Sequence, residues 1–433
     1  MTPQSLLQQI SSPSYLKDAW DKLNKSNKDS RGVSSETIKE FQDSLDAHIK
    51  EISKQLLSNT YKFNGVRAVL LKKKTPGEYR PLRIADIRDR LVQKALSAKL
   101  EDLLSTKYKL NNQCSFAYQK DTGVEKAIVK VIEHFKNGNK IILEADIKKF
   151  FDSVNRKKLL AKVFIELPDS SINSLIEESL EQSVEGLDKY SQDLHYYFSE
   201  SLDGIPQGNP LSPLLANIYL SEFDQRMIRE NICLVRYADD FIVLCKSAKE
   251  AENALAIAKE ELETNLGLEL HPLPSPSYLR GSKTRIIDPF YHEFSFLSIR
   301  FDGKNVWVSE KKVKDLLEKI DNITDIDKFT NDKDFQGLIT VIKRLKNLLE
   351  GWLSSFKFVD VDREFNEIDN FINHKLLQVF IKLDFKIKST ATVDVRLKNR
   401  KVVQGFSKIQ RNNTGVLSCE DFIKTLDRKK III

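Results

Sequence analysis

Apolar and polar residues alternate with a helical period through most of residues 1–60. In the stretch SSETIKEFQDSLDAHIKEISKQLL, apolar residues recur every three or four positions, which is the spacing of one face of an amphipathic helix. These residues are Ile38, Phe41, Leu45, Ile49, Ile52 and Leu56. Ser35 begins the stretch with the composition of a capping box. The pattern predicts a helical extension that serves to pack against the rest of the chain.

The spacing of apolar residues changes after residue 60. Residues 61–87 contain two short β-like runs in a strongly basic setting, and a Pro76-Gly77 turn lies between them. This pattern predicts a basic hairpin that could handle phosphate. The helical period returns in DRLVQKALSAKLEDLL and GVEKAIVKVIEHFKNG, which end the region near residue 140.

Residues 141–309 mix strands with helices. KIILEADIKKFF predicts a strand at 141–145, followed by a loop and a helix that Asn155 caps. GIPQGNPLSPLLANIYL predicts a loop that leads into a helix, with Ser212 at the N-cap and Pro213 at the first helical position. RYADDFIVLC reads as strand, turn and strand, and FSFLSIRFDGKNVWVS as a second hairpin around Asp302 and Gly303. Beyond residue 309 the chain becomes helical and basic.

The candidate chemistry lies at the tip of the RYADDFIVLC hairpin. Asp239 and Asp240 are adjacent carboxylates between apolar runs, so they repel each other and are costly to bury. Two divalent ions, about 3.5 to 4 Å apart, can stabilise the attacking and leaving oxygens when nucleotides are joined, and such ions prefer carboxylate ligands. Asp146, at the end of the predicted strand 141–145, would supply the third carboxylate. An Asp-Asp pair taken alone is more often a solvated turn.

Composition narrows the class of partner. Lys and Arg (69) exceed Asp and Glu (62), and the net charge of +7 suits a polyanion. The four cysteines form no C-x-x-C pair, which argues against a zinc ribbon or a disulfide framework. No apolar stretch of membrane-spanning length and no signal-like start occurs, so we expect a cytoplasmic protein without a membrane partner.

In order along the chain, ADIKKFFD, IPQGNPLSPLLANIYL, YADD, Lys283 with Thr284, and FLSIRF resemble the successive motifs of reverse transcriptases. More narrowly, the chain resembles the group II intron type of bacterial reverse transcriptase, including its N-terminal extension, fingers and thumb. The resemblance implies an α+β right-hand polymerase. Its parts would be a helical extension (1–60), fingers (61–140), a palm with part of the fingers between its motifs (141–309), a helical thumb (310–384) and a basic C-terminal tail (385–433).

The resemblance also implies roles for individual residues. Asp146, Asp239, Asp240 and the carbonyl of Ile147 would hold two Mg²⁺ ions, with Mn²⁺ as an alternative. Phe151 would act as a steric gate against 2′-hydroxyls, although an aromatic residue beside Phe150 could also belong to the core. The expected nucleotide-binding residues are Arg67, Lys73, Arg80, Phe151, Gln207, Gly208 and Lys283, and Lys283 would protonate pyrophosphate. Thumb lysines Lys343, Lys346 and Lys357 would grip the primer-template duplex.

Several motifs depart from the family pattern. SFAYQKD replaces a Gly-Phe-Arg-Pro type sequence, QGNPLSP replaces a Gly-Gly version, and Ser298 stands where glycine is common. We also expect no endonuclease module, since about fifty residues follow the predicted thumb. The leading hypothesis is therefore an RNA-directed DNA polymerase that makes cDNA from a bound structured noncoding RNA, in antiphage defence. The alternatives are an endonuclease-less intron maturase and a non-catalytic RNA-binding scaffold. No oligomeric state or priming mode is predicted.

Overall fold

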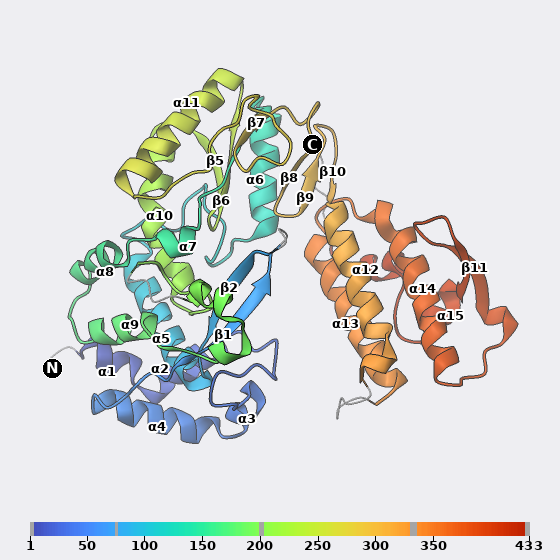
Figure 1. Ribbon diagram of the computed structural model, residues 1–433, viewed down its shortest axis with the longest axis horizontal. Helices are drawn as coiled ribbons and strands as arrows, with labels where there is room; N and C mark the ends of the chain where they lie inside the picture. The colour runs from blue at the N-terminus through green and yellow to red at the C-terminus, as the bar shows by residue number, and fades with distance from the viewer. Residues whose placement is uncertain (1–3, 74–76, 199–202, 330–335, 429–433) are drawn as a thin grey trace. The chain divides into compact units, whose positions relative to one another are not determined.

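The computed structural model describes residues 4–73, 77–198, 203–329 and 336–428. The chain forms two compact units (Figure 1). The first comprises residues 1–127 and 143–286, and the second comprises residues 128–142 and 287–433. Helices and mostly antiparallel sheets occur in both units, which confirms the predicted α+β class. None of the described helices is long and apolar enough to cross a membrane.

The first unit begins with the predicted helices. They are α1 (Leu6–Ile10), α2 (Pro13–Asp21), α3 (Ile38–Asp43) and α4 (Leu45–Leu57). The prediction that Ser35 starts the capping box is wrong, because Ser35 adopts a positive φ of 64°. The box is formed by Thr37, whose hydroxyl accepts from the Glu40 amide while the Glu40 carboxylate accepts from the Thr37 amide. Ser44 then divides α3 from α4.

The basic hairpin forms as predicted. Strands β1 (Val66–Lys72) and β2 (Tyr79–Ile84) are antiparallel, in a register that pairs Arg67 with Ile84, and the short strand β4 (Val184–Glu185) runs parallel to β1. Pro76 of the predicted turn lies outside the described residues. The long helix α5 (Ile87–Leu104) follows β2 and packs against α2.

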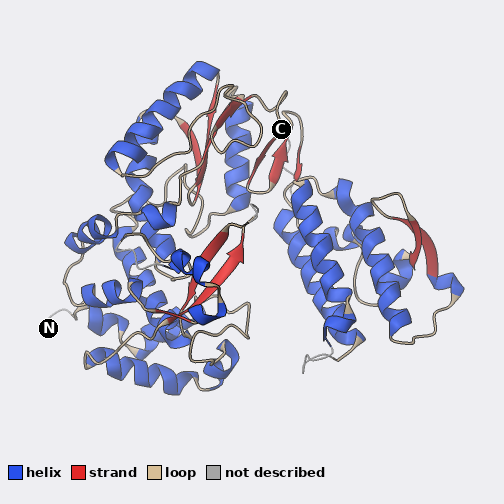
Figure 2. Ribbon diagram, in the orientation of Figure 1, coloured by secondary structure: helices blue, strands red, loops and turns tan. Residues whose placement is uncertain are grey.

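The strands drawn in red in Figure 2 include a four-stranded sheet, whose strand order is β5-β6-β3-β7. Its strands are β3 (Ile141–Ala145), β5 (Cys233–Tyr237), β6 (Asp240–Cys245) and β7 (Arg285–Ile287). The other elements between residues 124 and 265 are α6 (Val124–Lys136), α7 (Phe150–Ser153), α8 (Arg156–Ile165), α9 (Asn173–Leu180), the 3₁₀ turns η1 (Leu187–Lys189) and η2 (Gln192–Phe198), α10 (Ser212–Arg229), α11 (Ala248–Lys259) and the π-helical turn η3 (Glu260–Asn265). The division into two units falls within α6, β3 and β7, so each of these elements contributes residues to both units. Because β5 and β6 are almost wholly buried, the tip that joins them has a rigid support.

Two of the predicted caps can be checked here. The Asn155 side chain accepts from the Lys158 amide and caps α8, as predicted. Helix α10 begins at Ser212, so Leu211 is its N-cap, and the predicted cap at Ser212 is one residue too late. The Ser212 hydroxyl donates instead to the Pro206 carbonyl at 2.6 Å, which ties the start of the helix to the preceding loop.

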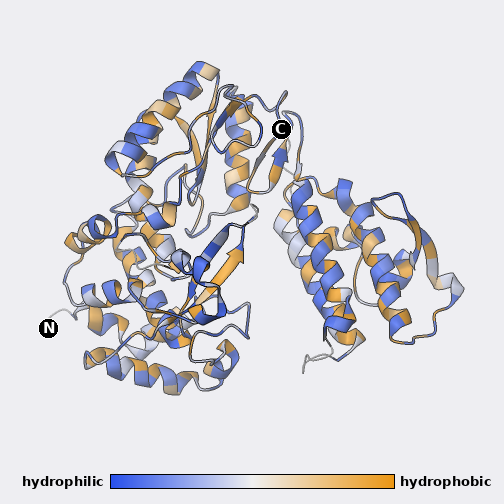
Figure 3. Cartoon of the chain, viewed as in Figure 1, coloured by the Kyte–Doolittle hydropathy of each residue, from blue (hydrophilic) through white to orange (hydrophobic). Residues whose placement is uncertain are grey.

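The second unit contains a three-stranded sheet, a set of long helices and the C-terminal segment. Its sheet has the order β10-β9-β8, and the predicted hairpin around Asp302 joins β9 to β10. The elements are β8 (Phe294–Phe296), β9 (Ile299–Phe301), β10 (Val306–Val308), α12 (Glu310–Thr324), η4 (Ile326–Phe329), α13 (Leu338–Phe356), η5 (Asp362–Glu364) and α14 (Phe365–Lys382). Apolar residues interleave with polar ones along α12, α13 and α14 (Figure 3), and α12 packs against the other two helices.

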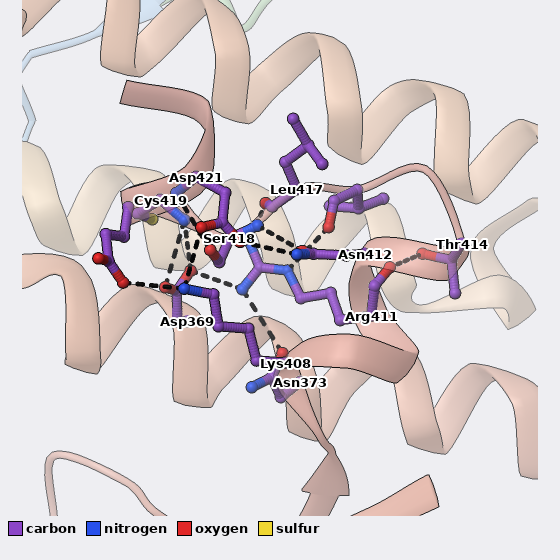
Figure 4. Close-up of polar contacts among 12 residues, drawn as sticks. Asp369, Asn373, Lys408, Arg411, Asn412, Thr414, Leu417, Ser418, Cys419 and Asp421 are labelled. Carbon is purple, nitrogen blue, oxygen red and sulfur yellow. Dashed lines mark hydrogen bonds and ion pairs between the residues drawn. The ribbon is translucent and has the colours of Figure 1, made fainter. Parts of the chain in front are cut away.

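The C-terminal segment, residues 385–428, folds onto α14. It consists of η6 (Ser389–Ala391), the antiparallel pair β11 (Thr392–Arg396) and β12 (Val402–Phe406), α15 (Lys408–Asn413) and α16 (Cys419–Ile423). Strand β12 packs directly on α14, and Gly405 lies so close that an added Cβ would be 3.1 Å from the His374 amide nitrogen. The buried Arg411 joins this segment to Asp369 of α14 (Figure 4).

Candidate active site

The tip of the β5–β6 hairpin, here called the catalytic turn, consists of Ala238 and Asp239. Tyr237 pairs with Asp240, so only two residues connect the strands. Ala238 adopts a left-handed conformation with φ of 60°, as tight two-residue hairpins require. Asp239 and Asp240 are therefore presented from a buried hairpin at a fixed position.

Asp146 joins these aspartates from the end of β3. This strand lies between β6 and β7 in the sheet. The backbone beyond Asp146 is held by Lys148, whose amide donates to the Glu269 carbonyl at 2.7 Å, and by His271, whose amide donates to the Asp146 carbonyl at 3.1 Å. These two bonds flank the bridge between Ile147 and Leu270 and do not use the backbone of Ile147.

Two cationic or ionisable side chains face the Asp146 carboxylate. Lys283 Nζ donates to Asp146 Oδ2 at 2.6 Å, and His271 Nε2 lies 3.7 Å from the same oxygen. The hydrogen bond to Asp146 raises the pKa of Lys283 above its ordinary value. Lys283 was predicted at this site, whereas His271 was not.

The three aspartates form a cluster of negative charge. Burial, followed by the charges of Asp239 and Asp146, raises the pKa of Asp240 to about 6. Burial and the charge of Asp146 also raise the pKa of Asp239. Both shifts have the causes expected of neighbouring carboxylates, although Asp239 is only half-buried and Asp240 is exposed at the tip. A cation bound among them would relieve this repulsion.

The donor atoms suit a hard divalent cation. The three carboxylates offer only oxygen ligands, which Mg²⁺ and Mn²⁺ accept, and Mg²⁺ usually keeps water and substrate phosphate in its shell. Within the described ranges, no group of three His, Cys, Asp or Glu side chains is already arranged as a metal site. Lys283 donates to Oδ2 of Asp146, so a cation held by this carboxylate would share it with the lysine.

The predicted steric gate and nucleotide loop lie together. Phe151 is half-buried and meets Phe150 edge-on, with ring centroids 5.4 Å apart. The Phe151 carbonyl accepts from the Ile205 amide at 2.8 Å, which joins it to the loop that leads to Gln207. The Gln207 carbonyl in turn accepts from the Arg83 amide of β2 at 2.8 Å.

Gly208 is needed where this loop meets β2. Its φ is 108°, and an added Cβ would be 2.6 Å from the Arg83 carbonyl oxygen. A side chain at this position would therefore be strained both by its backbone conformation and by the contact. The loop, the steric-gate candidate and the basic hairpin thus meet in one place.

The predicted fingers cations differ in their surroundings. Arg80 is exposed on β2 and is close enough to Asp239 for its charge to oppose the rise in the pKa of that residue. Lys73 lies 3.9 Å from Glu78. Arg67 donates to the Arg31 carbonyl at 3.0 Å, so its guanidinium is partly used within the protein.

The predicted thumb lysines belong to the second unit. Lys343 and Lys346 are exposed on α13, and Lys346 lies 3.9 Å from Glu350. Lys357 is half-buried and donates to the Asp427 carbonyl at 3.4 Å. The first two lysines are thus better placed to meet a nucleic acid than Lys357 is.

Comparison with known proteins gives two family matches. Residues 71–273 match the family described as reverse transcriptase (RNA-dependent DNA polymerase). Residues 313–389 match the group II intron maturase-specific domain. The fold is therefore that of a reverse transcriptase, an RNA-directed DNA polymerase with the right-hand α+β fold. More narrowly, the chain belongs to the group II intron-like bacterial reverse transcriptases, as its sequence predicted.

One of the similar proteins is encoded by a group II intron. Protein YkfC of Escherichia coli is 26% identical over 311 residues, which cover 62% of this chain and 77% of YkfC. The group II intron-encoded protein LtrA of Lactococcus lactis is 29% identical over 199 residues, which cover 46% of this chain but only 31% of LtrA. A solved partial Cas6-RT-Cas1–Cas2 complex is 26% identical, covers 60% of this chain and 43% of that chain, and has a TM-score of 0.34.

Proposed function

We propose that this chain copies an RNA template into DNA at the site formed by Asp146, Asp239 and Asp240. The observation that carries the proposal is the meeting of three carboxylates at the end of one sheet, where burial and mutual repulsion raise the pKa of Asp239 and Asp240. Such a cluster is stabilised by bound cations. The match of residues 71–273 to reverse transcriptases supports the same reading.

The three aspartates, with the carbonyl of Ile147, would hold Mg²⁺, or Mn²⁺ in its place. When bound, the ions would polarise the α-phosphate and lower the pKa of the attacking hydroxyl. Lys283, already beside Asp146, would give a proton to the departing pyrophosphate. Arg80, Lys73 and Arg67 would offer positive charge to the bound triphosphate and to the pyrophosphate as it leaves.

Selection of the nucleotide would fall to Phe151 and to the loop of Gln207 and Gly208. The Phe151 ring would meet a 2′-hydroxyl and so favour deoxynucleotides. The Gln207–Gly208 loop, tied to β2 through Arg83, would contact the incoming nucleotide and its template base. Lys343 and Lys346 of the proposed thumb, residues 310–384, would hold the duplex through its phosphates.

Primer extension tests the polymerase proposal. The purified chain, given an RNA template, an annealed DNA primer, deoxynucleotides and Mg²⁺, should extend the primer. The variant carrying Asp239→Asn and Asp240→Asn should not, because amides bind Mg²⁺ poorly in place of carboxylates. Equal extension by the variant would contradict the assignment of the metal-binding residues.

For the natural template, we propose a dedicated structured noncoding RNA in the cytoplasm, with a role in antiphage defence. The support is the basic balance of the chain and its departures from the intron-protein pattern at SFAYQKD, QGNPLSP and Ser298. The match of residues 313–389 to a maturase-specific domain favours a second candidate, an endonuclease-less maturase that assists splicing of its intron.

Sequencing of the nucleic acid that co-purifies with the chain distinguishes the two candidates. A compact RNA together with its complementary DNA would support the defence enzyme. An RNA with intron ribozyme domains, and no complementary DNA, would support the maturase. Loss of phage resistance in cells that carry the Asp239→Asn, Asp240→Asn variant would then test the defence role itself.

A further inference from the structure

Directly beneath the catalytic turn lies a wholly buried arginine, Arg236, which is 1% exposed. Its guanidinium makes a two-point contact with Asp224 of α10, with Nε 2.7 Å from Oδ1 and Nη2 2.5 Å from Oδ2. Its remaining nitrogen, Nη1, donates to the Ala238 carbonyl at 2.8 Å and to Asn217 Oδ1 at 3.1 Å. The arginine thus joins the turn to the helix packed behind it.

The Ala238 carbonyl needs such a donor. Ala238 is a non-glycine residue with φ of 60°, a conformation that costs free energy and persists only when its surroundings impose it. The bond from Arg236 fixes the peptide between Ala238 and Asp239. Since Asp239 is the next residue, this bond constrains the backbone from which its carboxylate projects.

The partners of Arg236 also form hydrogen bonds with a second segment, residues 114–117, or with Asn112, which precedes it. Asn217 Nδ2 donates to the Ala117 carbonyl at 2.9 Å, and Asn112 Nδ2 donates to Asp224 Oδ2 at 3.1 Å. Asn112 Oδ1 also accepts from the amides of Cys114 and Ser115, at 3.0 and 2.9 Å. Residues 114–117 are thereby held from two sides.

This segment runs alongside β5. Ser115 forms a parallel bridge with Arg236, whose amide donates to the Cys114 carbonyl at 2.7 Å and whose carbonyl accepts from the Phe116 amide at 3.0 Å. Tyr118, three residues beyond Ser115, is 51% exposed, and burial together with the charge of Asp239 raises its pKa, which shows that the two residues are near each other. The buried residues therefore hold Tyr118 and the catalytic turn in one fixed arrangement.

A buried ion pair adds little to folding stability, because proteins in which apolar residues of similar volume replace it are often equally or more stable. Here every polar partner of Arg236 other than Asp224 leads to the catalytic turn or to the segment beside it. We infer that the buried residues Arg236, Asp224 and Asn217, together with the half-buried Asn112, are positioning residues that fix Asp239 for catalysis. The inference rests on the proposed function of the three aspartates.

The test replaces the ion pair by apolar residues of similar volume, with Arg236→Met and Asp224→Leu combined. The variant should stay folded, because no unpaired charge remains. It should lose about 100-fold in kcat for primer extension, the order expected from a small misplacement of a catalytic group. KM for the nucleotide should change by less than about threefold, since nucleotide contacts are retained.

A second measurement is independent of activity. Binding of Mn²⁺ alone to the full chain, followed by electron paramagnetic resonance, should weaken by about tenfold, as it does when groups that orient metal ligands are removed. This measurement decides the inference even if the natural chain fails to extend primers, an outcome that would overturn the proposed function but not the positioning role.

A milder variant covers the case in which the double variant does not fold. Asn217→Ala keeps the ion pair but removes the bonds to Arg236 and Ala117, and it should lower kcat by about tenfold at unchanged KM. The matched control is Arg411→Met with Asp369→Leu, which alters the other buried arginine pair and should leave kcat and Mn²⁺ affinity unchanged. Full kcat and full Mn²⁺ affinity in the folded Arg236 and Asn217 variants would overturn the inference.

Discussion

Arg236 in the first unit and Arg411 in the second are both fully buried and both contact an aspartate, but they hold different parts of the molecule. Arg236 contacts Asp224 in the first unit, and Arg411, which is 0% exposed, contacts Asp369 at 2.5 Å in the second. Both also donate to backbone carbonyls. Arg236 gives its bond to Ala238 in the catalytic turn, whereas Arg411 gives its bonds to Val416 and Leu417, between α15 and α16 (Figure 4).

The partners of Arg411 indicate a structural task. Asp369 and Asn373 both lie on α14, and the Asp369 carboxylate also accepts from the Cys419 amide at 3.1 Å. Removal of Arg411 would therefore release the C-terminal segment from the helix without touching the three aspartates. The burial of an arginine–aspartate pair does not by itself reveal its role. The role is indicated by the other groups that the arginine contacts, which are the catalytic turn for Arg236 and the C-terminal segment for Arg411.

The largest effect on stability is expected at Arg411. Arg411→Met leaves the Asp369 carboxylate without its cation, which should cost about 3 to 5 kcal/mol of unfolding free energy. Urea unfolding would measure this loss, and limited proteolysis should show earlier cleavage within residues 385–428. The comparison of the two arginines fails if kcat per folded molecule drops as far as it does in the Arg236 variants.

Substitution of Phe151 should change selectivity without a comparable loss of stability. Phe151→Ala removes the ring that would meet a 2′-hydroxyl, so preference for deoxynucleotides over ribonucleotides should fall by about 10- to 100-fold, the usual value of a lost steric contact in a pocket. Competitive incorporation on an RNA template would measure it. If the preference for deoxynucleotides over ribonucleotides did not change, Phe151 would be a core aromatic residue and not a steric gate.

The smallest effect concerns Glu364 of the second unit and depends on pH. Burial raises the pKa of Glu364 to about 7. The charges of Asp360 and Glu367 add to this rise, and the charge of Arg363 opposes it. In the described part of the chain, its Oε2 is buried without a hydrogen-bond partner. The native state therefore keeps the Glu364 proton to a higher pH than the unfolded state does. As a result, the free energy of unfolding falls as the pH rises from the pKa of the unfolded state toward 7, and it stays at the lower value above pH 7.

Glu364→Gln removes that pH dependence. The variant should be more stable than the natural chain at pH 8, by about 1 kcal/mol after allowance for partial solvent screening, and no more stable at pH 4. Thermal unfolding at both pH values would measure the difference. A gain of equal size at the two pH values would show that ionisation of Glu364 is not its cause.

The sequence predicted the parts of the site that depend on local pattern. The apolar runs around Asp239 and Asp240 predicted the β5–β6 hairpin, and IILEA predicted the strand that ends before Asp146. These features come from residues close together in the chain, where a short continuous apolar run next to a turn indicates a buried strand. The order of the motifs then identified the family.

The remaining features depend on contacts between distant residues. His271 reaches Asp146 because Ile147 and Leu270 form a bridge, and nothing in either short segment predicts that pairing. Asp224 and Asn217 look like ordinary polar positions of α10 until the helix packs behind Arg236. The basic, strand-like pattern after residue 385 likewise gave no hint that Arg411 would join it to α14.

Single-nucleotide extension of a primer on an RNA template, in excess enzyme and Mg²⁺, is the most direct measurement of the proposed chemistry. The natural chain should add the nucleotide, and Asp240→Asn should slow the step by about 1,000-fold or more, because it removes a carboxylate proposed to hold the ions at the developing charge. The Arg411→Met, Asp369→Leu control should react at the natural rate. Extension by Asp240→Asn at the rate of the natural chain would contradict the assignment of this site.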